Sequence, residues 1–181
     1  MSDTPVISPV GAPHPFNSRD AMSRFVRAGL TTAIIDGLFS SILSVAAYGS
    51  TVSRLFQGVA ATLLGSSAFD GGARTTGLGM LMHCGVAFGW SAFFVFVVMR
   101  SAKIRSVLAS RYGSLKVAAV YGPAIWLVMS LLVIPVLLHR PPAISIRWWI
   151  QLLGHFPFVG IPTVVSASRG AHRSESEAAP A

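Results

Sequence analysis

Three ionisable side chains in this sequence, Asp36, His83 and His155, lie inside long apolar segments. An Asp at membrane depth costs about 2.5–3.5 kcal/mol on insertion scales, so such groups turn towards protein, water or each other. A carboxylate near two imidazoles can form packing hydrogen bonds, carry protons or supply metal ligands. These three residues are therefore the candidate site, and Gln57 and Gln151 are secondary polar residues.

The segments that carry these residues are four apolar stretches, at about residues 28–48, 76–99, 117–138 and 148–166. A helix rises about 1.5 Å per residue, so each stretch is long enough to cross a hydrocarbon core of about 30 Å. Residues 76–99 contain no Asp, Glu, Lys or Arg at all. We therefore predict four transmembrane helices.

A fifth apolar run, from Leu55 to Leu64, is too short to cross. Its apolar residues recur at helical spacing, which is typical of a short helix that lies in the interface or re-enters the membrane. The predicted fold class is thus an all-α membrane protein, with four transmembrane helices and one short interfacial or re-entrant helix between the first and the second.

Composition supports the membrane class, because 52% of the 181 residues are hydrophobic and only 11% are charged. The net charge of +8 comes from basic residues that flank the apolar stretches, so nucleic acid is not an expected partner. We divide the chain into a disordered tail (1–26), a transmembrane domain (27–166) and a second disordered tail (167–181). The single Cys84 excludes an intrachain disulfide.

The basic residues also predict the orientation. Most of the 14 Lys and Arg residues fall on one side of a four-span arrangement: Arg19, Arg24, Arg27, Arg100, Lys103, Arg105, Arg111, Lys116, Arg169 and Arg173. The other side holds Arg54, Arg74, Arg140 and Arg147. Since cytoplasmic loops are enriched in Lys and Arg, both termini are predicted to be cytoplasmic.

The two histidines lie at matching depth, because each follows the outer end of its span, Thr76 or Trp148, by a similar number of residues. That distance is roughly 10 Å along a helix, and Asp36 lies about 18 Å from Tyr48. We therefore predict that both rings turn inward and lie within roughly 10–15 Å of each other. Asp36 is expected on the same inner side, up to about two turns deeper.

Four roles for this cluster stay open on sequence grounds. The groups can pack the bundle through interhelical hydrogen bonds, or form a proton-linked or small-solute pathway. The histidines can also hold haem b between them, or ligate a divalent metal together with Asp36. No close-spaced ligand motif supports either cofactor, so none is predicted.

Motifs for catalysis are absent from the sequence: it has no GxSxG and no phosphate-binding glycine loop, so no catalytic residue is assigned and an enzyme is not favoured. Gly85 and Gly89 form a GxxxG pair that predicts close packing by another helix, in a homo-oligomer or with a membrane-protein partner. The sequence favours a structural or interaction component of a membrane assembly. The alternatives are a small proton-linked transporter or channel, or a bis-His haem b protein.

Four stretches, at residues 55–72, 77–94, 121–135 and 154–162, together resemble an uncharacterised family of small bacterial inner-membrane proteins. The matching residues are Asp36, Gln57, Gly58, Leu63, Leu64, Gly65, His83, Tyr121, Gly122, Pro135, Gly154, His155, Gly160 and Pro162. The resemblance covers roughly residues 28–166. It implies four spans in the bacterial inner membrane and carries no activity.

Overall fold

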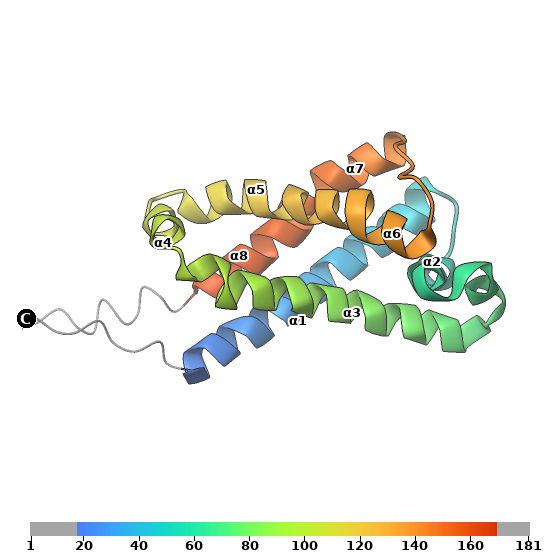
Figure 1. The fold of residues 1–181 in the computed structure, drawn as a ribbon, viewed down its shortest axis with the longest axis horizontal. Coiled ribbons are helices and arrows are strands. Elements are labelled where there is room, and N and C mark those ends of the chain that lie inside the picture. The colour runs from blue at the N-terminus through green and yellow to red at the C-terminus, as the bar shows by residue number, and fades with distance from the viewer. Residues whose placement is uncertain (1–17, 170–181) are drawn as a thin grey trace, which may run out of the picture.

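The computed structural model describes residues 18–169, and in this range every regular element is helical. Four helical segments are long and apolar enough to cross a membrane: Ser18–Ala47, Gly72–Arg100, Gly113–Leu138 and Ile146–Ser168. A shorter helix, α2 (Val52–Leu64), lies between the first and the second. The predicted all-α fold with four membrane-length helices and one short helix is confirmed (Figure 1).

The first segment consists of α1 (Ser18–Ile42) and a π-helical turn, and it begins earlier than expected. Residues 18–26, predicted to belong to the N-terminal tail, are helical instead. The reason is packing: Ala21 is buried, and the Phe25 ring contacts the rings of Phe88 and Phe96. Residues 1–17 and 170–181, which make up the rest of the predicted tails, lie outside the described residues.

The other three segments are also interrupted helices. They are α3 (Gly72–Phe96) with a 3₁₀ turn, α5 (Gly113–Val128) joined by a π turn to α6 (Ile134–Leu138), and α7 (Ile146–His155) joined by a π turn to α8 (Ile161–Ser168). The two π turns directly precede Pro135 and Pro162. A proline removes an N–H donor and crowds the preceding turn, and a π turn accommodates both effects.

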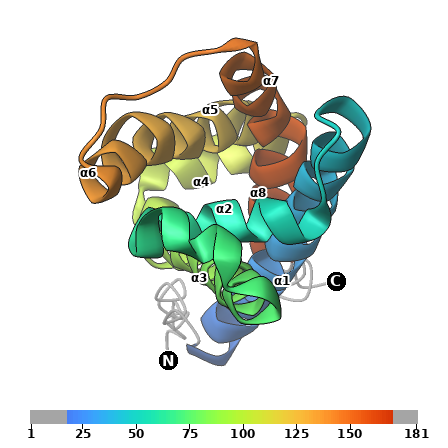
Figure 2. The same ribbon diagram turned by 90° about the vertical axis from the view of Figure 1, so that its right-hand side faces the viewer.

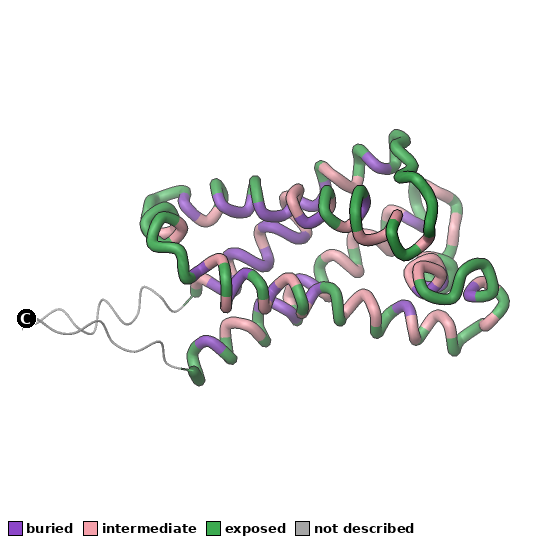
Figure 3. Tube along the Cα trace, viewed as in Figure 1, coloured by how far each residue is buried: buried purple, intermediate pink, exposed green. Residues whose placement is uncertain are grey.

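The bundle packs most tightly away from α2. Ala28, Phe94, Ala118 and Val164, from four different helices, are fully buried there. Figure 3 shows the buried residues concentrated where α3, α5 and α8 converge, whereas the part near α2 is more exposed. The side chains at the α2 end are therefore less completely enclosed by this chain.

Short helices lie across both ends of the bundle. α2 crosses one end (Figure 2), and its first turn is capped by Thr51, whose hydroxyl accepts from the Arg54 amide at 3.1 Å. At the other end α4 (Ala102–Leu108) joins α3 to α5 and runs crosswise to both (Figure 1). Arg105 fixes this corner, because its guanidinium donates to the carbonyls of Met99 and Arg100 at 3.2 and 2.6 Å.

Candidate functional site

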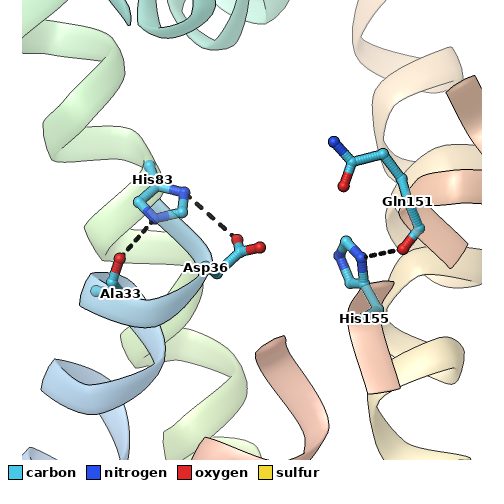
Figure 4. Close-up of polar contacts among 5 residues, drawn as sticks. All are labelled: Ala33, Asp36, His83, Gln151 and His155. Atoms are coloured by element: carbon cyan, nitrogen blue, oxygen red, sulfur yellow. Dashed lines mark hydrogen bonds and ion pairs between the residues drawn. The ribbon is translucent and has the colours of Figure 1, made fainter. Parts of the chain in front are cut away.

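Asp36 of α1 and His83 of α3 meet inside the bundle (Figure 4). The Nδ1 atom of His83 lies 3.9 Å from Oδ2 of Asp36, and Nε2 lies 3.1 Å from the Ala33 carbonyl oxygen. Their side chains are only 16% and 17% exposed, respectively for His83 and Asp36. Since a carbonyl can only accept, Nε2 carries a hydrogen and Nδ1 is the nitrogen that faces the carboxylate.

This arrangement has a direct consequence for protonation. In a neutral ring with Nε2–H, the Nδ1 lone pair would face an anionic oxygen, which is repulsive. The contact between His83 and Asp36 becomes attractive when one additional proton resides on the ring or on the carboxyl group. The pair is therefore suited to hold a single exchangeable proton.

His155, the last residue of α7, approaches Asp36 from another span. Its Nδ1 atom donates to the Gln151 carbonyl at 2.7 Å, which leaves Nε2 as the nitrogen that can gain or lose a proton. The residue is 8% exposed, and its ring centroid lies 4.8 Å from that of Trp126. Both histidines interact electrostatically with the Asp36 carboxylate, which lies between them in Figure 4.

Glycines and aromatic rings of the neighbouring helices position the two histidines. A Cβ atom at Gly37 would lie 3.3 Å from Nε2 of His83, so the glycine leaves room for the ring. The Phe56 ring of α2 covers His83 edge-on at 5.9 Å. Gly122 of α5 lies against the backbone of His155, where a Cβ atom would collide with the His155 carbonyl. The site thus depends on close backbone approach on two sides.

Two buried polar atoms near the site lack a hydrogen-bond partner among the described residues: Oδ1 of Asp36 and the indole Nε1 of Trp126. A buried polar group without a partner costs about 1–3 kcal/mol. One turn before Asp36, by contrast, Thr32 is fully paired with Thr163 at 2.8 Å. An unpaired acceptor and an unpaired donor beside His155 indicate a centre that this chain alone leaves incomplete.

The structure therefore brings Asp36, His83 and His155 together from three membrane-length helices. Asp36 contacts His83 directly, so its carboxylate lies level with that ring. The side chain of Gln151 points into the same interior region (Figure 4). Gln57 lies elsewhere: it is buried at the junction of α2 and α3, where its Nε2 donates to the Gly72 carbonyl at 3.2 Å.

Gly85 and Gly89, the predicted packing residues, face outward on α3. A Cβ atom at either position would meet nothing within 4 Å. The glycine of α3 that does admit a neighbour is Gly79, where a Cβ atom would collide with the Phe56 carbonyl of α2. Packing of Gly85 and Gly89 against a second protein stays a prediction.

Sequence reasoning missed Trp126 and Phe56, which contact the two histidines. A signal existed for Trp126, because it lies in the middle of its span whereas Trp148 and Trp149 mark a span end. Phe56 had no comparable signal. Its place over His83 depends on how α2 folds back across α3.

The residues present give little support to a cofactor. Among residues 18–169, no group of three or more His, Cys, Asp or Glu side chains is arranged to hold a metal ion. A haem between the two histidines would compete for space with the Asp36 side chain (Figure 4). Haem b and a divalent metal both stay untested predictions.

Comparison with protein-family models, curated proteins and solved structures finds no match to this chain. The resemblance to small four-span membrane proteins therefore stays a prediction. Class assignment rests on the fold itself: four apolar helices of membrane length are those of a multi-pass, all-helical integral membrane protein.

Proposed function

We propose that the protein is a small proton-linked transporter or channel of the bacterial inner membrane, with Asp36, His83 and His155 as its proton-binding residues. The observation that carries this proposal is the contact between Nδ1 of His83 and Oδ2 of Asp36, whose attraction requires an additional proton. A group that binds one proton at membrane depth is a typical element of a proton relay.

The surroundings of Asp36 support transfer rather than permanent storage of that proton. Oδ2 faces His83, whereas Oδ1 has no partner among the described residues and can accept from water or a passing solute. His155 attracts the same carboxylate from a third span. A carboxyl group between two imidazoles can exchange its proton with either one, so the centre has an entry and an exit.

Orientation and assembly form part of the proposal. Both termini are cytoplasmic, because the end of the bundle that holds α4 carries most of the basic residues. Four spans enclose little volume, so the pathway is completed by a second copy or by a membrane-protein partner. The outward-facing Gly85 and Gly89 would allow another helix to approach closely.

Proton flux into liposomes tests the proposal. Purified protein is reconstituted with a pH-sensitive dye inside, and a potassium gradient with valinomycin drives proton entry. We expect Asp36→Asn, which keeps the shape but removes the titrating group, to lower the flux at least about tenfold. The matched control is Thr32→Val, one turn earlier on α1, which breaks the bond to Thr163 and leaves the ionisable groups intact.

Flux equal to that of protein-free liposomes would contradict the proposal, as would equal flux in wild type and Asp36→Asn. The second candidate function, a structural component of a membrane assembly, is favoured by the same outcome. It has its own supporting observation in the open, outward-facing pair Gly85 and Gly89.

A further inference from the structure

The end of the bundle opposite α2 carries a dense group of basic residues. We name it the basic α4 surface and define it as Arg100, Lys103, Arg105, Arg111 and Lys116, all of them exposed. Arg24 and Arg27 of α1 belong to the same end of the bundle (Figure 1). Among residues 18–169, Asp20 is the only acidic residue at this end. So much uncompensated positive charge attracts anions.

Exposed apolar side chains lie among these cations. Val107, Tyr112 and Leu115 are 38%, 54% and 44% exposed, respectively. α4 runs crosswise to the spans (Figure 1), so it lies along the membrane surface when the spans cross the membrane. A surface with cations and apolar groups side by side suits a phospholipid, which offers an anionic headgroup and acyl chains. A soluble anion would use only the cations.

Part of the basic α4 surface is preorganised. Arg105 is held by two backbone carbonyls through one of its nitrogens, which leaves its other donors for a ligand. The Arg111 guanidinium rests over the Tyr112 ring at 5.1 Å. Lys103 and Lys116 make no hydrogen bond or ion pair with any described residue, and both can turn to a phosphate.

The opposite end differs in arrangement as well as in number. Its Arg54 and Arg147 lie over the rings of Phe69 and Tyr48, at 4.9 and 4.1 Å. Arg74 and Arg140 are exposed and carry equal charge, but they lie on separate connections of the chain. These two residues therefore offer a control that matches Lys103 and Lys116 in charge and exposure.

From these observations we infer that the basic α4 surface binds the headgroup of an anionic membrane phospholipid, of the phosphatidylglycerol or cardiolipin type. Binding would anchor α4 at its membrane surface and stabilise the corner between α3 and α5. The inference is independent of proton transport, because it depends on residues at the end of the bundle and not on Asp36.

Native mass spectrometry and thermal unfolding in a neutral detergent test this inference. We expect phosphatidylglycerol to bind and to raise the melting temperature, and phosphatidylcholine to do neither. The double variant Lys103→Gln/Lys116→Gln should bind phosphatidylglycerol roughly tenfold or more weakly, because each basic residue near a lipid surface contributes several-fold. Arg74→Gln/Arg140→Gln should bind as wild type does, and high salt should weaken wild-type binding.

The helical circular dichroism and the melting temperature without lipid check that both variants fold. Equal binding of the neutral and the anionic lipid would overturn the inference, as would equal losses in the two double variants. Millimolar inorganic phosphate is the third arm. If it stabilises the protein as well as the lipid does, the ligand is a soluble anion and the lipid assignment fails.

Discussion

At the residue scale, the polar side chains of the membrane helices differ in how completely they are paired. Thr31 and Thr32 of α1 bond to Ser166 and Thr163 of α8, at 2.9 and 2.8 Å. Asp36 lies one turn further along the same helix and keeps an oxygen without a partner. The threonine pairs are typical of helix packing, whereas the open carboxylate is what distinguishes the proposed proton-binding centre.

Pairing can be tested at Ser130, whose hydroxyl accepts from the buried indole Nε1 of Trp148 at 3.0 Å. We expect Ser130→Ala to lower the free energy of unfolding by about 1–3 kcal/mol, because the indole N–H loses its acceptor. Ser110→Ala serves as the control, since that exposed serine bonds only to the nearby Val107 carbonyl. Thermal unfolding in detergent measures both variants, and equal melting temperatures would show that the Ser130 bond contributes nothing.

At the element scale, glycines decide which helices touch. Backbones come together where Gly79 of α3 meets α2 and where Gly122 of α5 meets the turn after α7. These approaches bring Phe56 over His83 and hold His155 in place. The proposed function therefore depends on glycines that have no chemistry of their own.

A pair of neighbouring glycines on α3 tests this dependence. A Cβ atom at Gly79 would collide with the Phe56 carbonyl, whereas one at Gly77 would meet nothing within 4 Å. We expect Gly79→Ala to destabilise the protein by about 1–3 kcal/mol, through overpacking between α2 and α3. Gly77→Ala should be neutral, or stabilising by up to about 1 kcal/mol, because alanine favours helix. Chemical unfolding in detergent compares them, and similar losses in both would argue against the α2 contact.

At the scale of the whole molecule, crosswise helices lie at the two ends of the bundle and carry different charge. α4 and its flanks are rich in Lys and Arg, whereas α2 itself contains only Arg54. Positive charge favours the cytoplasmic side during insertion. The same asymmetry supports both the proposed orientation and the binding of anionic lipid by the basic α4 surface.

Reporter fusions test the orientation directly. Fusions after residues 110 and 170 should report the cytoplasm, and a fusion within residues 70–74 should report the opposite side, because only this orientation keeps most basic residues inside. Phosphatase and fluorescent-protein activities in whole cells provide the measurement. A periplasmic signal at residue 110 would reverse the orientation and place the basic α4 surface in the outer leaflet.

The sequence by itself determined the number and positions of the membrane-length helices and the short helix α2. Hydropathy and length are local properties, and a span of about 20 apolar residues has few alternatives to a helix. The same local argument identified Asp36, His83 and His155, since an ionisable group is conspicuous in an apolar stretch. It placed the start of α1 too late, because residues 18–26 are polar in composition but pack through Ala21 and Phe25.

Only the tertiary structure decided which faces meet. Gln57 and Gln151 look equivalent in sequence, yet one joins α2 to α3 while the other lies beside His155. Gly85 and Gly79 are equally small, but only Gly79 admits a neighbouring backbone. The contact of His83 with Asp36 and the Ala33 carbonyl depends on the rotation of α1 against α3. That rotation is set by side chains distant in sequence, and no local pattern encodes it.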